Sequence, residues 1–265
     1  MALHHILILA LVQGVTEFLP ISSSGHLVLA SQVMGWPDQG LIIDVAVHVG
    51  TLFAVMLYFW RDLIRVVIGC WRLIQFRGGA EAQLSRNLII ATIPVVIVGF
   101  LAKSYIETYL RSAEIIAWTT LIFGLLLWIT DRMGLTIRRI EHLGVFNALF
   151  IGFAQVLALV PGTSRSGITM TAARLLGMER SDAARFSMLM SIPTIMGAGL
   201  LSGLDLYKSG DIALGTDVLI AVGLSFVTAL VAIWGLMAWL KHAGFTPFVL
   251  YRILLAAVLF YWIYG

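Results

Sequence analysis

The chain has 265 residues and a formal net charge of +3, with 60% hydrophobic and only 12% charged residues, against roughly 25% charged in soluble domains. So few charges cannot cover a water-facing surface, and the composition therefore excludes a soluble protein and predicts an all-α, polytopic integral membrane protein. The single cysteine, Cys70, excludes an internal disulfide and a Cys-cluster metal site.

The first apolar stretch, residues 4–34, does not have the pattern of an ordinary membrane span. The residues before it lack the Lys/Arg-rich region of a removable signal peptide, so we expect none. A proline and a Ser/Gly cluster, Pro20–Gly25, lie at its centre. Pro and Gly break helices, and the freed backbone groups survive at membrane depth only inside protein or beside water. We predict a re-entrant hairpin of two half-helices, with a single kinked span as the alternative.

Three ordinary spans follow, then a second broken stretch, then three more spans. A spanning helix needs about 20 mostly apolar residues. The second broken stretch, 147–175, has Pro161–Gly167 at its centre and predicts a second re-entrant hairpin. The six predicted spans are residues 43–59, 87–102, 115–130, 186–203, 218–240 and 245–264.

The loops between these elements differ sharply in positive charge. Twelve of the seventeen Lys and Arg residues lie in one alternate set of loops, which comprises residues 60–86, 131–146, 174–185 and 241–248. Three lie in the other set, residues 36–42, 103–114 and 204–217. The positive-inside rule places the first set in the cytoplasm and both termini outside. Because the charge is grouped in this way, the sequence pI of about 9.2 does not indicate nucleic-acid binding.

The predicted topology repeats with opposite orientation. The two hairpins enter from opposite sides and each precedes three spans, which is an inverted-topology repeat whose broken-helix tips meet near the midplane. A shift of 141 residues lays Pro20 on Pro161 and Ser23 on Ser164. We therefore predict a single membrane domain over residues 1–265, with repeat 1 at about 1–131 and repeat 2 at about 146–265.

Few ionisable side chains lie within the apolar stretches, and such residues are costly at membrane depth and therefore functional candidates. They are Glu17, His26, Asp44, His48, Arg165 and Arg252. Glu17 and Arg165 lie beside the helix breaks, and a structural ion pair between them is the alternative to a functional role. Asp44 and His48 are spaced i, i+4, so they either line the same cavity or form a local pair on one helix face. Arg252 lines the cavity, forms a satisfied structural pair or extends to the membrane interface.

The two breaks together predict an anion site. Gln13 and Glu17 share one face of the first half-helix. Ser22 or Ser23 can cap the next half-helix, and Ser164 can do so in the second hairpin; the free N–H groups of such helix starts favour phosphate. The fork of Arg165 can bind phosphate oxygens in bidentate fashion. The site fits a diphosphate, and Glu17 can hold a divalent cation that bridges the phosphate oxygens.

At these two positions the chain closely resembles the undecaprenyl-diphosphatase (bacitracin-resistance) family. The family's (E/Q)xxxE motif is matched by Gln13-Gly-Val-Thr-Glu17, and its Phe-Leu-Pro-x-Ser-Ser-x-Gly-His motif ends at His26. Its PGxSRSxxT motif is present from Pro161 to Thr169, and the Pro-Phe-x-x-Tyr-Arg ending at Arg252 also fits. The family's first motif position can be Glu, whereas here it is Gln13.

The resemblance implies an enzyme of the bacterial inner membrane that hydrolyses undecaprenyl diphosphate, and shorter prenyl diphosphates, to the monophosphate and inorganic phosphate. It implies recycling of the lipid carrier for peptidoglycan synthesis, bacitracin resistance, a site that opens to the outer face, a divalent cation (Mg²⁺ or Ca²⁺) and contact with membrane lipid; a homodimer is possible. The catalytic residues carried over by position are Glu17, Ser23, His26 and Arg165. The phosphate-binding residues are Gln13, Ser22, Ser24, Gly25, Ser164, Ser166 and Thr169.

The mechanism and one other functional class stay open at this point. His26 or Glu17 can act as the general base that activates Ser23 or a water, while Arg165 and the helix N-termini stabilise charge on the phosphoryl oxygens. Inverted repeats with broken helices also occur in secondary transporters. A transporter or a lipid-carrier flippase is therefore the alternative function.

Overall fold

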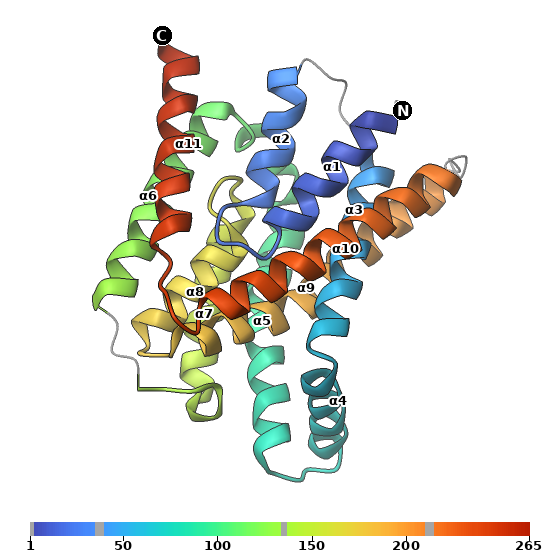
Figure 1. The fold of residues 1–265 in the computed structure, drawn as a ribbon. Coiled ribbons are helices and arrows are strands. Elements are labelled where there is room, and N and C mark those ends of the chain that lie inside the picture. Colours follow the sequence, from blue (N-terminus) through green and yellow to red (C-terminus); the bar gives the residue numbers. More distant parts are fainter. Residues whose placement is uncertain (1–2, 35–39, 134–136, 210–214) are drawn as a thin grey trace.

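The computed structural model describes residues 3–34, 40–133, 137–209 and 215–265, and in these ranges the chain is helical, with one isolated β-bridge and no strand. The all-α prediction is therefore confirmed (Figure 1). The helices are α1 Leu3–Thr16, α2 Ser23–Met34, α3 Gly40–Tyr58, α4 Trp60–Ile74, α5 Ala80–Tyr109, α6 Ala113–Met133, η1 Ile140–His142, α7 Val145–Val156, η2 Leu157–Leu159, α8 Arg165–Leu175, α9 Arg180–Ser209, α10 Gly215–Trp239 and α11 Thr246–Tyr264.

Apolar helices long enough to cross a bilayer identify a multi-pass membrane protein. Among the described residues, α5, α6, α10 and α11 meet this condition, and α3 with α4 forms a further candidate that is bent by 87°. The outer surfaces of these helices expose large apolar side chains, such as Phe100 at 71% and Leu254 at 65%. Lipid can solvate such a surface, whereas water cannot do so without a large free-energy cost.

Both apolar stretches that contain Pro and Ser/Gly clusters are broken, as the sequence predicted. In the first stretch, α1 ends at Thr16 and α2 begins at Ser23. In the second, α7 continues into η2, and α8 begins only at Arg165. Each stretch therefore consists of two short helices joined by a non-helical segment, residues 17–22 and 160–164 respectively, which we call the first and second break loops.

The helices pack in pairs that connect the two halves of the chain. Helices α1 and α3 of the first half pack against α10 of the second half, and α7 of the second half packs against α5 of the first half. The helices α6 and α11 lie side by side, and α8 packs against α6, α7 and α9. Both termini lie at one end of the molecule in Figure 1, opposite the turn between α4 and α5.

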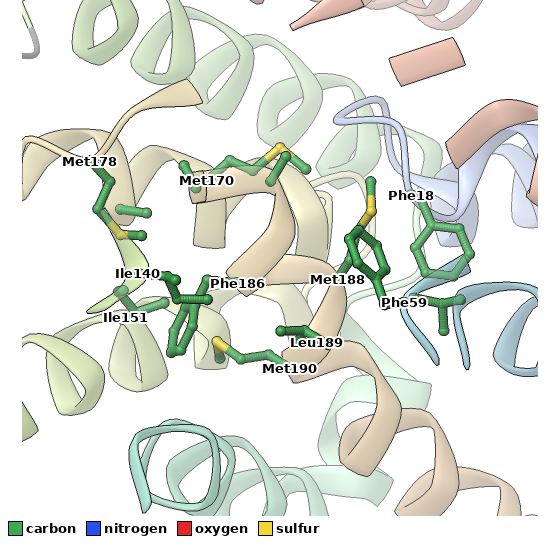
Figure 2. Close-up of a cluster of buried hydrophobic side chains, with 14 of the residues drawn as sticks. Phe18, Phe59, Ile140, Ile151, Met170, Met178, Phe186, Met188, Leu189 and Met190 are labelled. Atoms are coloured by element: carbon green, nitrogen blue, oxygen red, sulfur yellow. The ribbon is translucent and has the colours of Figure 1, made fainter. Parts of the chain in front are cut away.

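The largest apolar core among the described residues includes α8, the helix that follows the second break loop. Figure 2 shows Phe18, which follows Glu17, together with Met170 of α8 and Phe186 and Met188 of α9, and all four side chains are fully buried. Residues 166–174 of α8 are buried on every side. A densely packed interior leaves little freedom for movement, so this core holds the elements that carry the break loops.

Helix α4 is a difference from the sequence prediction, which treated residues 60–86 as a loop. The helix buries Asp62, whose carboxylate accepts a hydrogen bond of 2.9 Å from Arg185 Nε, and it exposes Val67 and Trp71. At Gly69 an added Cβ would clash with the carbonyl of Glu81 in α5, so glycine permits the close approach of the two helices. The sequence has no run of about 20 apolar residues here, because polar residues at helical spacing, such as Arg61, Arg65 and Arg72, interrupt it.

Candidate active site

A cavity of about 340 Å³ lies where the two break loops meet α3 and α9. Four separate parts of the chain form its wall, and most of the polar side chains in that wall were singled out from the sequence. The lining residues are Glu17, Ser22, Ser23, Ser24, Asp44, Val45, His48, Ala158, Ser164, Arg165, Thr194, Ile195 and Gly199.

The carboxylate of Glu17 is the centre of the hydrogen-bond network in this cavity. Its Oε2 accepts hydrogen bonds from Ser23 Oγ at 2.6 Å and from Gln13 Nε2 at 2.9 Å. Its Oε1 lies 3.2 Å from Arg165 Nη2. The residue is only 7% exposed, and a carboxylate so buried needs partners of this kind to remain ionised. The first and second break loops therefore meet through the Glu17–Arg165 ion pair.

Two serines cap the helices that start at the break loops. The hydroxyl of Ser164 accepts a hydrogen bond from the backbone N–H of Gly167 at 3.1 Å, and that of Ser22 accepts one from Gly25 at 3.3 Å. Both serines have positive φ angles, 75° at Ser22 and 71° at Ser164. Non-glycine residues rarely adopt this conformation, and it recurs at functional sites. Because Ser22 acts as the cap, Ser23 is free to contact Glu17.

Arg165 is oriented by two contacts from its guanidinium. Besides the bond to Glu17, its Nη1 donates to the backbone carbonyl of Ser187 at 3.2 Å. Its side chain is 14% exposed and borders the cavity. Together with the N-termini of α2 and α8, it makes this end of the cavity favourable for an anion.

Four of the residues that the sequence assigned to phosphate binding do not border this cavity: Gln13, Gly25, Ser166 and Thr169. Gln13 supports Glu17, as described above. Ser166 Oγ donates to the carbonyl of Leu19 at 2.8 Å and so joins the start of α8 to the first break loop. Thr169 Oγ1 lies 2.6 Å from Ser187 Oγ. These side chains support the residues that line the cavity.

His26 also lies outside the lining of the cavity, in the first turn of α2. Its Nδ1 donates to the carbonyl of Ser22 at 2.6 Å, so in the neutral ring Nε2 accepts from the hydroxyl of Tyr251, also at 2.6 Å. The two rings are stacked, with centroids 5.7 Å apart. Tyr251 was not predicted as a site residue, although it lies in the Pro-Phe-x-x-Tyr-Arg run that ends at Arg252.

Asp44 and His48 lie on one face of α3 and border the cavity, as one of the two sequence interpretations proposed. The contact between them is a hydrogen bond from His48 Nδ1 to the backbone carbonyl of Asp44 at 2.7 Å. In the described part of the chain, no three Asp, Glu, His or Cys side chains form a group that could hold a metal ion by themselves.

Arg252 does not line the cavity and does not extend to the membrane interface, so these two predictions are wrong; the third interpretation, a satisfied structural side chain, is closer, although its partners are backbone carbonyls and not a charged group. The side chain is 0% exposed and donates hydrogen bonds to backbone carbonyls of both break loops and of α6. Packing between α6, α8 and α11 encloses it, and no local sequence pattern reveals this.

Comparison with known proteins gives matches over nearly the whole chain. A family model described as bacitracin resistance protein BacA matches residues 6–258. The undecaprenyl-diphosphatase of Alcanivorax borkumensis is 52% identical over 258 residues, which cover 97% of both chains. The proteins of the same name from Chromohalobacter salexigens and Alteromonas mediterranea are 52% and 48% identical, with coverage of 98% and 100% of both chains respectively.

Proposed function

The chain belongs to the family of bacitracin resistance protein BacA, and on this premise we infer that it is an integral membrane undecaprenyl-diphosphatase. It hydrolyses undecaprenyl diphosphate to undecaprenyl phosphate and inorganic phosphate, and so recycles the lipid carrier for cell-wall synthesis. Because bacitracin sequesters the diphosphate, removal of this substrate also gives resistance to the antibiotic.

The observation that carries this proposal is the contact between Ser23 and Glu17 beside two helix N-termini. The Ser23 hydroxyl donates to the Glu17 carboxylate at 2.6 Å, and Arg165 holds the other carboxylate oxygen. A nucleophile bonded to a base that a third group orients is the usual arrangement for covalent catalysis. The capped starts of α2 and α8 favour the negative charge of a diphosphate.

In the proposed reaction, Glu17 takes the proton of Ser23 while Ser23 Oγ attacks the terminal phosphorus. The bond between this phosphorus and the bridging oxygen breaks, and undecaprenyl phosphate leaves. Water then hydrolyses the phosphoserine and releases inorganic phosphate. Arg165 and the free N–H groups of the helix starts stabilise charge on the phosphoryl oxygens, which is the main contribution of a protein to phosphoryl transfer. His26, bonded to Tyr251, has no proton transfer in this scheme.

A divalent cation, Mg²⁺ or Ca²⁺, fits the donor groups at this cavity. Mg²⁺ sites that act on phosphates commonly use one or two carboxylates and complete their coordination with water and substrate oxygens. Glu17 and Asp44 border the same cavity and would hold the ion. When bound, the cation would offset charge on the diphosphate oxygens.

We extend the proposal to the arrangement in the membrane: six spans and two re-entrant hairpins in one inverted-topology repeat, in the bacterial inner membrane, with the site open to the outer face. Two features support it. Both hairpins are broken at Pro and Ser/Gly clusters, and the packing of α1 on α10 has its counterpart in that of α7 on α5. The positive charge of the segments 60–86 and 174–185 supports their cytoplasmic location.

Purified protein in detergent with farnesyl diphosphate and undecaprenyl diphosphate tests the function. We expect release of one inorganic phosphate per substrate and dependence on added Mg²⁺ or Ca²⁺. A transporter or flippase would move the lipid without releasing phosphate, so an intact diphosphate after prolonged incubation would contradict the proposal. The matched control is the Glu17→Gln variant, prepared in the same detergent.

A further inference from the structure

The guanidinium of Arg252 has an unusual environment for a charged group inside a membrane protein. It is 0% exposed, and among the described residues its hydrogen bonds all go to backbone carbonyls. An arginine side chain has five N–H donors in a fixed planar fork. Five acceptors surround it: the carbonyls of Pro20, Thr119, Thr120, Gly162 and Thr163, at 3.0 to 3.4 Å.

These carbonyls connect the two break loops to each other. Nη1 donates to Pro20 in the first break loop and to Thr163 in the second. Pro20 is two residues before the cap Ser22, and Thr163 directly precedes the cap Ser164. Nη1 alone is therefore hydrogen-bonded to both break loops, directly before the helix starts that are proposed to bind the diphosphate. The donors Nε and Nη2 attach this unit to α6 through the carbonyls of Thr119 and Thr120.

Two glycines leave the space that the guanidinium occupies. An added Cβ at Gly124 of α6 would lie 3.2 Å from Arg252 Nε, and one at Gly167 of α8 would lie 3.0 Å from Nη1. Such separations are shorter than ordinary van der Waals contacts, so a larger residue would displace the arginine. The guanidinium of Arg252, on α11, therefore fits closely against the glycines of α6 and α8.

Burial of a charge costs free energy, and simple packing would be better served by an apolar side chain. A structural reason for arginine is its ability to satisfy five carbonyls from separate segments at once, since lysine has only three donors on one atom. The first break loop with the start of α2 supplies Glu17 and Ser23, and the helix start that follows the second break loop supplies Arg165. The relative position of the two break loops therefore decides whether these groups meet.

We propose that Arg252 is a positioning residue for the reaction. It fixes the first and second break loops relative to each other, and thereby sets the distance between the Ser23–Glu17 pair and Arg165 without touching the substrate. The inference rests on the proposed phosphatase function. Misplacement of reacting groups by about 1 Å can lower a rate by about 10²-fold.

The first experiment compares Arg252→Lys with Arg174→Lys. Arg174 is also fully buried, but it bonds to Asp131 and to the carbonyl of Met178, away from both break loops. We expect both variants to lower the midpoint of thermal unfolding. Only Arg252→Lys should reduce kcat, by about 10²-fold, with KM close to wild type because the prenyl chain still binds. Assays run well below both midpoints.

A milder perturbation avoids any loss of folding. Gly124→Ala adds one methyl group against Arg252, whereas Gly223→Ala adds one where nothing lies within 4 Å. We expect Gly124→Ala to lower kcat while Gly223→Ala matches the wild type. Both residues lie within helices, so the helix propensity gained is the same.

Each result decides the inference. Near wild-type kcat in both Arg252→Lys and Gly124→Ala would overturn it. An equal loss of kcat in Arg174→Lys at the same loss of thermal stability would also overturn it, because the effect would then be general destabilisation. If the wild-type protein releases no phosphate, the proposed function itself is wrong. If the wild-type protein is active and the Arg252→Lys variant is equally active, only the positioning role is wrong.

Discussion

At the scale of single residues, the contacts of the Glu17 carboxylate determine the geometry of the site. Glu17 has three partners, namely Gln13, Ser23 and Arg165, and together they hold the carboxylate in one orientation. The two sequence interpretations of Glu17 and Arg165, a functional pair and a structural ion pair, are both compatible with this geometry. An ion pair that borders a cavity can orient a base and also contribute to stability.

The substitution Glu17→Gln separates these contributions. An amide of nearly the same shape keeps hydrogen-bonding groups but cannot take a proton from Ser23, so phosphate release should fall by about 10²–10⁴-fold. Turnover of a prenyl diphosphate and the thermal unfolding midpoint are measured on the same purified sample. The control is Glu114→Gln, where an exposed carboxylate accepts a hydrogen bond of 2.6 Å from the hydroxyl of Tyr264. Wild-type turnover in Glu17→Gln would rule out its role as the base.

At the scale of elements, the breaks in the two hairpins are what produce the site. A continuous helix would have its N–H groups bonded internally, but α2 and α8 start inside the protein and leave their first N–H groups free. The caps Ser22 and Ser164 satisfy part of this requirement, and both do so from left-handed backbone conformations. The conformation costs free energy locally, and the surrounding core stabilises it.

This strain predicts an unusual order of stability at Ser164. Ser164→Ala loses the cap, which costs about 1 kcal/mol, whereas glycine at a cap costs only a few tenths. Glycine also adopts a φ of 71° without penalty. The Ala variant should therefore be less stable than the Gly variant by more than the cap alone explains, as measured by unfolding in detergent.

The comparison needs a cap with ordinary backbone. Ser112 accepts a hydrogen bond from Ile115 at 3.2 Å at the start of α6, and its φ is not positive. At Ser112 the Ala variant should be less stable than the Gly variant only by the difference that loss of the cap produces, which is less than about 1 kcal/mol. Equal differences at both sites would mean that the backbone of Ser164 carries no strain.

At the scale of the whole molecule, the outer surface and the interior differ in polarity. The outside of α5, α6, α10 and α11 is apolar and exposed, while most polar groups lie at the cavity, in buried hydrogen bonds or at the ends of helices. This distribution is the inverse of that in a soluble domain. It also requires that the exposed ends of the helices carry the charge that sets orientation.

The orientation can be tested by labelling cysteines in intact cells. In a Cys70→Ser background, Gly78→Cys lies in the turn between α4 and α5, where an added Cβ meets nothing within 4 Å. A membrane-impermeant maleimide should label it only after permeabilisation, because the segment 60–86 is rich in arginine and is therefore expected in the cytoplasm. Ser112→Cys, at the opposite end of α5, should be labelled directly. Labelling of Gly78→Cys in intact cells would mean that the orientation in the membrane is opposite to the one proposed.

Much of the fold followed from local patterns. The proline and Ser/Gly clusters at Pro20 and Pro161 placed both helix breaks, since a missing backbone donor next to several small, flexible residues disfavours a continuous helix. Glu17 and Arg165 were expected in one site because each lies beside a helix break, and the broken-helix tips of an inverted-topology repeat meet near the midplane. Helix α4 was missed, because a short amphipathic helix has no long apolar run to mark it.

What the sequence by itself determined is that lipid surrounds the protein, where the long apolar helices lie and where the two stretches break, because these depend on composition and on neighbours along the chain. What only the tertiary structure decided is which side chains face the cavity. Arg252 is held by carbonyls up to 232 residues away, and His26 bonds to Tyr251 across 225 residues. Such contacts arise from the packing of helices that are distant in sequence, and a single sequence carries no local signal of which faces meet.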